Sequence, residues 1–180
     1  MEISAVTLSL SSLILLVSTA NFLHLKDWYD RPKPAISFIE DECVHACDKE
    51  PKHTDYRLKI ENKGRSIFYN ANVKVVKMSR NGVILKINPF HLNWANQNTD
   101  GSRDVSDTPE FVNLVYTLNS NGDYAFIRNK SMHDERGIAN KIEPGEWIIT
   151  LQLFGGNNVK FNKQVKVVFE RGKKLKLSVI

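Results

Sequence analysis

The segment from Ile3 to Leu25 contains no Asp, Glu, Lys or Arg, and no other feature constrains the fold of this chain as strongly. Leu, Val, Ile and Ala dominate it, and its Ser and Thr hydroxyls can bond back to a helix backbone. A helix crosses the bilayer core with about 20 apolar residues. We therefore predict a transmembrane anchor over residues 1–25, a juxtamembrane stalk over 26–34 and one folded domain over 35–180.

A secretory signal peptide is the alternative interpretation of this segment. Signal peptides begin with a basic region and have a short apolar core. Here Met1-Glu2 carries no Lys or Arg, and the apolar run is longer than such a core. These two features favour an uncleaved anchor. Ser18-Thr19-Ala20 could serve as a small-residue cleavage site, so cleavage is not excluded.

The residues that flank the anchor predict its orientation. Lys and Arg close to a membrane span remain on the cytoplasmic side. None precedes the segment, and Lys26, Arg31 and Lys33 follow it. Trp28 and Tyr29 lie where interfacial aromatic residues are common. We therefore expect a single-pass membrane protein with its domain in the cytoplasm.

Basic residues are concentrated toward the end of the chain. There are 25 Lys and Arg against 20 Asp and Glu, and all the basic ones follow the predicted span. Seven lie between Val159 and Ile180, with Glu170 as the acid among them. We interpret this as a solvated strand face, because Lys on edge strands blocks aggregation. Contact with anionic lipid is the alternative, and we expect no nucleic-acid partner.

Alternation of apolar and polar residues predicts strands through most of the domain. In Asp55–Glu61 the side chains of Tyr56, Leu58 and Ile60 share one face. Asn81-Gly82 is typical of a hairpin turn. Further strands are expected around residues 73–76, 83–87, 90–94, 111–118, 124–127, 146–154, 165–169 and 175–179. About eight strands and no amphipathic helix predict an all-β fold, a β-sandwich.

One stretch also resembles a known family. Tyr56–Val75 runs from an alternating strand, through Glu-Asn-Lys-Gly-Arg-Ser, into a second strand, and it resembles the opening B–C hairpin of immunoglobulin-like sandwiches of the CARDB and adhesion-module type. Trp94 and the segment Ile142–Asn157, where Pro-Gly leads into a strand, are similar to the later strands of these modules. The resemblance covers most of residues 35–180. It implies an immunoglobulin-like antiparallel sandwich of 7 to 9 strands behind one transmembrane helix, as in membrane-anchored prokaryotic proteins of unknown function, and it brings no catalytic residues.

Four potential metal ligands lie close together in the sequence. Cys43, His45, Cys47 and His53 form the pattern C-x-H-x-C-x5-H. Thiolate and imidazole bind soft metals, but this is not the C-x2-C spacing of structural zinc sites. We interpret the cysteines as free or structural thiols. A local disulfide, in an oxidising compartment, and a metal site remain as alternatives.

Motifs for catalysis and phosphate binding are missing from the sequence. It contains no G-x-S-x-G, and no helix pattern follows Gly155-Gly156-Asn157. Asp100, Asp104 and Asp107 lie in a polar loop without the spacing of an EF-hand. We therefore predict no catalytic residue and no cofactor.

The function we expect is that of a non-enzymatic, membrane-anchored interaction module. The bilayer binds residues 3–25, and a protein partner binds loops held by the rigid scaffold. The candidate loops are Ala95–Pro109 and Arg128–Glu143. The alternative is a metal- or thiol-dependent sensor or enzyme that uses Cys43, His45, Cys47 and His53.

Overall fold

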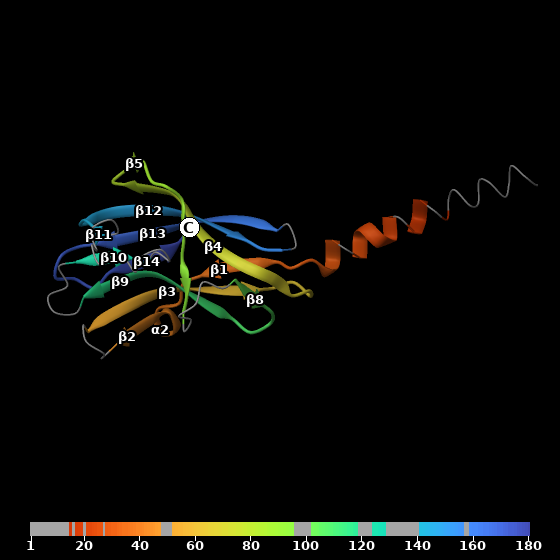
Figure 1. Ribbon diagram of the computed structural model, residues 1–180, viewed down its shortest axis with the longest axis horizontal. Coiled ribbons are helices and arrows are strands. Elements are labelled where there is room, and N and C mark those ends of the chain that lie inside the picture. Colours follow the sequence, from red (N-terminus) through yellow and green to blue (C-terminus); the bar gives the residue numbers. More distant parts are fainter. Residues whose placement is uncertain are drawn as a thin grey trace, which may run out of the picture.

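Two antiparallel β-sheets pack face to face, and a helical segment at the N-terminus extends from one end of them (Figure 1). The computed structural model describes residues 15, 17–19, 21–26, 28–47, 52–95, 102–118, 124–128, 141–156 and 159–180. Apolar side chains of both sheets form one buried core. The predicted all-β sandwich is therefore confirmed.

The first sheet is organised around the long strand β3. Its path is β1-β3-β9-β10-β11, with β2 also paired to β3 and β7 to β9. The one-turn helix α2 (Glu40–Cys43) joins β1 to β2, and these two strands pair with opposite halves of β3. The strands are β1 (Pro34–Ser37), β2 (Val44–Cys47), β3 (His53–Asn62), β7 (Asn93–Trp94), β9 (Glu110–Leu118), β10 (Ala125–Ile127) and β11 (Lys141–Ile142).

The second sheet is organised around β4 and β12. Its path is β14-β13-β12-β4-β5, with β6 and β8 also paired to β4. Residues 145–154 and 160–169 pair without interruption as a hairpin. The strands are β4 (Phe68–Arg80), β5 (Val83–Leu85), β6 (Phe90–His91), β8 (Arg103–Val105), β12 (Gly145–Phe154), β13 (Lys160–Phe169) and β14 (Lys176–Val179).

The predicted alternation and turns are confirmed in both sheets. Tyr56, Leu58 and Ile60 of β3 are all buried in the core. The apolar residues of β12 are buried in the same alternating way. Asn81 and Gly82 have φ angles of 47° and 82°, as a two-residue hairpin turn requires. In the long alternating strands, the period of two therefore correctly identified which side chains face the core.

Two expectations about the connections need correction. β3 and β4 belong to different sheets, so Tyr56–Val75 is a crossover between sheets and not a hairpin. The polar segment Ala95–Pro109 contains β8, which pairs with β4. The described residues form fourteen strands in place of the expected 7 to 9. The extra strands have two to four residues, which is too short for alternation to be recognised.

The N-terminal segment is helical at residues 17–19, 21–26 and 28–30. The first part of the predicted stalk is therefore a helix. Nowhere in the described part of the chain is a helix both long enough and apolar enough to cross a membrane. The predicted span over residues 3–25 lies largely outside the described residues, which lack positions 1–14, 16 and 20.

The side chain of Asn62 joins the stalk to the sandwich. Its Oδ1 accepts hydrogen bonds from the backbone N–H of Lys33 (2.9 Å) and of Gly64 (3.0 Å). Its Nδ2 donates to the carbonyl oxygens of Ser66 (2.7 Å) and Val105 (3.3 Å). One amide thus connects the chain before β1, the turn after β3, and β8.

We expect Asn62→Ala to lower the free energy of unfolding by about 2 to 3 kcal/mol, because it leaves partly buried backbone groups without partners. Chemical denaturation of the full chain measures this. Asn72→Ala is the control, since the side chain of Asn72 donates a single exposed hydrogen bond to the carbonyl of Asn70. An equal loss in the two variants would contradict the role given to Asn62.

Candidate functional site

A row of polar and aromatic side chains crosses the outer face of the first sheet. Because Tyr56 and Leu58 of β3 point into the core, the alternating residue Asp55 faces outward. The strand register places Asp55 opposite Tyr116 of β9, and Tyr116 opposite Phe126 of β10. Three residues that are far apart in the sequence are thereby aligned on one face.

The aromatic members of this row are in contact with each other and with cations. The rings of Tyr116 and Phe126 are stacked, with centroids 5.0 Å apart and an interplanar angle of 17°. The guanidinium carbon of Arg128 lies 4.2 Å from the centroid of Tyr116, and Lys141 Nζ lies 4.0 Å from that of Tyr124. Cation–π contacts of this geometry are favourable. We call these five residues, Tyr116, Tyr124, Phe126, Arg128 and Lys141, the aromatic–cation surface.

Asp55 fixes Arg128 in this position. It is 6 % exposed, and its Oδ1 accepts hydrogen bonds from Nη2 (3.0 Å) and Nε (3.3 Å) of Arg128. Arg57 Nη2 and His53 Nε2 lie 3.8 Å and 3.6 Å from Oδ2. Burial raises the pKa of Tyr116, so its phenol stays neutral at physiological pH. Two hydrogen bonds to Asp55 therefore hold the guanidinium of Arg128 over a neutral ring.

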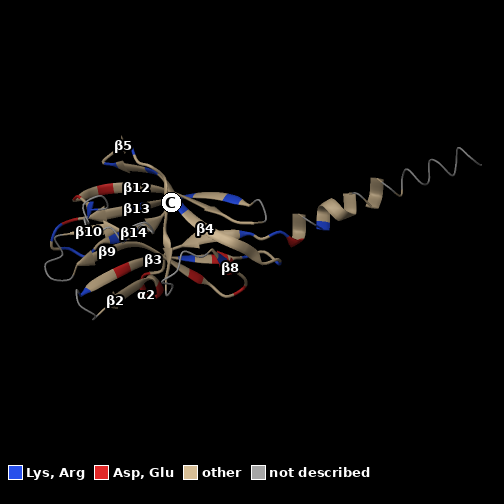
Figure 2. Cartoon of the chain, in the orientation of Figure 1, with Lys and Arg blue, Asp and Glu red and all other residues tan. Residues whose placement is uncertain are grey.

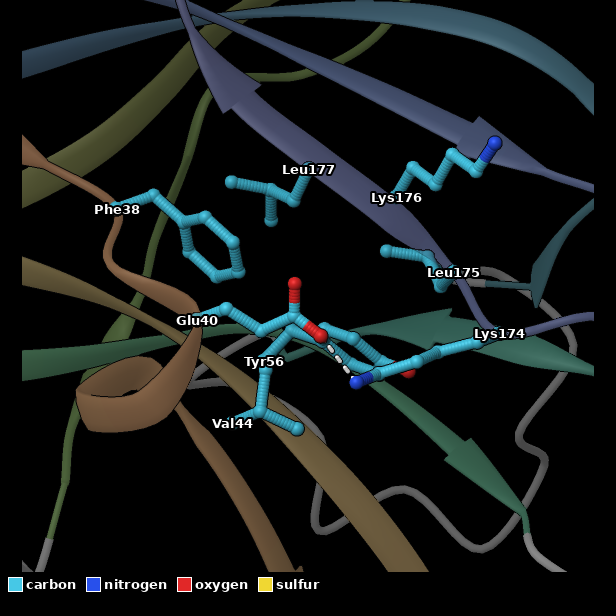
Figure 3. Close-up of a pocket in the computed structure, with 8 residues that line it drawn as sticks. All are labelled: Phe38, Glu40, Val44, Tyr56, Lys174, Leu175, Lys176 and Leu177. Carbon is cyan, nitrogen blue, oxygen red and sulfur yellow. Dashed lines mark hydrogen bonds and ion pairs between the residues drawn. The ribbon is translucent and has the colours of Figure 1, made fainter.

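A small pocket opens at another edge of the sandwich, between α2 and β14 (Figure 3). Its volume of about 260 Å³ is below the roughly 300 to 1,000 Å³ typical of small-molecule sites. An exposed ion pair between Glu40 and Lys174 lies beside the ring of Tyr56. Burial raises the pKa of Tyr56. The lining residues are Phe38, Glu40, Val44, Tyr56, Lys174, Leu175, Lys176 and Leu177. A cavity of this size fits a side chain better than a metabolite.

The structure does not bring the four candidate metal ligands together. Cys43 ends α2 and is fully buried, with its Sγ 3.5 Å from the backbone N–H of Ile39. Cys47 lies opposite His53, and His45 is exposed. Cys47 is the last residue of β2, four positions after Cys43, and about 13 Å of extended chain is too long a separation for one metal ion or a disulfide.

Both cysteines are free thiols in this structure. Across the described residues, no three His, Cys, Asp or Glu side chains are grouped so that they could hold a metal ion. Burial raises the pKa of Cys43, and such a thiol is less reactive than an ordinary one. The local disulfide considered as an alternative is not formed.

The predicted binding loops lie only partly within the described residues, which lack 96–101 and 129–140. Asp100 falls in the first of these gaps, whereas Asp104 is described and its Oδ1 accepts a hydrogen bond (2.8 Å) from the backbone N–H of Asn70. Asp55, Tyr116 and Phe126 were not among the predicted site residues. Each occupies an outward position of an alternating strand, and that is the signal that could have identified them.

Asp55→Ala should lower the free energy of unfolding by about 1 to 3 kcal/mol, because Arg128 and Arg57 lose the carboxylate that balances their charge. Asp104→Ala provides the comparison, since Asp104 is exposed and accepts its hydrogen bond at the surface. Thermal or chemical unfolding of both variants gives the result. A loss at Asp55 no larger than at Asp104 would show that the network is unimportant.

Thiol labelling of the folded chain should proceed in two phases. Cys47 is partly exposed and should react quickly with a disulfide reagent at pH 8, whereas Cys43 is buried and has a raised pKa. Cys47→Ser should remove the fast phase and Cys43→Ser the slow one. In the chain unfolded by denaturant, both thiols should react at the same fast rate, in a single phase. Fast labelling of Cys43 in the folded chain would contradict its placement.

Comparison with other proteins adds no second source of evidence about this surface. No protein-family model matches the chain, and no curated protein or solved structure matches it significantly. The arrangement of the chain's own residues is therefore the basis for the function proposed below.

Proposed function

We propose that this chain is a non-enzymatic interaction module, anchored in a membrane by residues 3–25, whose aromatic–cation surface binds a protein partner. The module is an immunoglobulin-like sandwich, and its domain faces the cytoplasm. The observation that carries the proposal is the stacking of Tyr116 on Phe126, together with Arg128 over the ring of Tyr116.

The composition of this surface supports protein binding. Residues that dominate the energy of protein interfaces are enriched in Tyr, Trp and Arg. Tyr124, at the edge of the surface, is 43 % exposed and lies beside Lys141. Because Asp55 and the stacked rings already hold Arg128, a partner would order few side chains on binding. Low ordering cost leaves more of the contact energy for affinity.

The position of the surface also supports this function. Figure 1 shows β10 and β11 at the end of the sandwich opposite the N-terminal helix. The length of β3 and β9 separates the surface from the stalk. A chain anchored through its N-terminal segment would therefore hold the surface away from the bilayer, where a partner's folded domain has room.

Photo-crosslinking in cells tests the proposal. A photoreactive amino acid placed at Tyr124 should give a discrete covalent adduct with another protein. The same amino acid at Ile67, which is 37 % exposed near the stalk, is the matched control and should not give that adduct. Arg128→Ala should reduce the yield from position 124 by at least tenfold, and Arg128→Lys should retain part of it.

Thermal unfolding of each Arg128 variant separates lost binding from lost folding. If the adduct from position 124 persists in a folded Arg128→Ala chain, the aromatic–cation surface is not the binding site. If no adduct forms from position 124 in the chain that retains Arg128, the proposal of a protein partner is wrong.

A further inference from the structure

The turn between β3 and β4 lies directly against the stalk. Arg65 of this turn places its guanidinium carbon 4.1 Å from the ring centroid of Tyr29. Lys33 Nζ lies 5.3 Å from the ring centroid of Trp28. Lys63 and Arg65 lie more than thirty positions after the start of the stalk in the sequence. In the structure they are beside the aromatic and basic residues of the stalk.

Backbone contacts hold this turn in place. The N–H of Lys63 donates to the carbonyl of Lys33, and the N–H of Ser66 donates to the carbonyl of Asp30, each at 2.9 Å. A Cβ added at Gly64 would lie 2.3 Å from the carbonyl oxygen of Arg31. Glycine thus permits a contact that a side chain would prevent, and the charges of the turn have a fixed position relative to the stalk.

The charges at this junction are exposed and mostly positive. Figure 2 shows Lys and Arg gathered where the helix meets the sandwich. All five basic side chains are exposed. In the sequence the acidic residues of the same stalk are Asp27 and Asp30, so the five basic residues exceed them by three charges. We call these five residues, Lys26, Arg31, Lys33, Lys63 and Arg65, the basic collar.

We infer that the basic collar binds the headgroups of anionic phospholipids and so fixes the orientation of the sandwich on the bilayer. The inference rests on the anchor in the proposed function, because a span ending near Leu25 brings the collar to headgroup level. Lys and Arg at that level attract anionic lipid. Trp28 and Tyr29, 55 % and 48 % exposed, suit the same interface.

Charge complementarity selects lipid as the partner of this surface. The collar lies at the point where the chain leaves the predicted membrane, and its positive charges outnumber Asp27 and Asp30 in the same stretch of sequence, so anionic headgroups there can supply the remaining counter-charge. Since both strands flanking the turn continue into the sandwich, fixing Lys63 and Arg65 at the headgroups also fixes β3 and β4. The aromatic–cation surface at the far end would then face away from the bilayer.

An environment-sensitive fluorophore beside the collar tests this inference. The full chain carries Ile67→Cys with Cys47→Ser, so that the exposed position 67 is labelled while Cys43 stays buried. It is reconstituted in vesicles of phosphatidylcholine, with or without about 30 % phosphatidylserine. We expect at least a twofold higher emission, shifted to the blue, with phosphatidylserine. Salt at 0.5 M should reduce the difference by screening.

Charge substitutions identify the collar as the cause. Lys63→Glu with Arg65→Glu should abolish the difference between the two vesicles, and Lys63→Gln with Arg65→Gln should remove most of it. The matched control is Lys77→Glu with Arg171→Glu, which changes the net charge equally at exposed positions away from the stalk. This control should keep the full difference.

Three outcomes would overturn the inference. Equal emission in the two vesicles for the unsubstituted collar would show that anionic lipid does not bind there. Loss of the difference in the control would assign it to net charge. Release of the chain from both vesicles by a carbonate wash would contradict both the membrane anchor and lipid binding by the collar. Retention of the chain with equal emission in the two vesicles would contradict lipid binding by the collar alone.

Discussion

The apolar contact within the core, to which the inward faces of β3 and β12 both contribute, is the interaction on which the rest of this structure depends. Leu58 and Ile60 on one strand and Ile149 and Leu151 on the other are fully buried. Burial of one such side chain contributes about 1.5 to 3 kcal/mol. Because successive side chains of a strand point to opposite faces, this contact also decides what faces outward. The exposed chemistry of the protein therefore follows from the packing of its core.

The two ends of the sandwich carry different chemistry as a result. At the end next to the stalk, Asn62 and Gly64 let the turn after β3 pack on the chain before β1, which brings Lys63 and Arg65 beside the stalk. At the far end, Asp55 holds Arg128 against Tyr116. A rigid sandwich keeps these two surfaces at a constant separation. Lipid binding at one end would thus orient protein binding at the other.

Asp55 is a buried carboxylate in a strand whose other buried residues are Tyr56, Leu58 and Ile60. Burying a charge is costly unless it is paired, and here two guanidinium groups and an imidazole lie within 4 Å. Such a network adds little net stability compared with apolar packing. Its consequence is geometric, because Arg128 is held in one orientation over Tyr116. The proposed binding surface depends on that orientation.

The sequence by itself determined the all-β class, the inward faces of β3 and β12, and the turn at Asn81-Gly82, because these depend on local periodicity and on positive φ angles. The short strands β1, β2 and β8 were missed, since three or four residues carry no measurable period. Proximity in sequence suggested a Cys–His site, but β2 is extended and separates Cys43 from Cys47. Only the tertiary structure decided which distant residues meet, namely Asp55 with Arg128 and Tyr29 with Arg65. Strand register and sheet pairing control those contacts, and neither is encoded within a single segment of the chain.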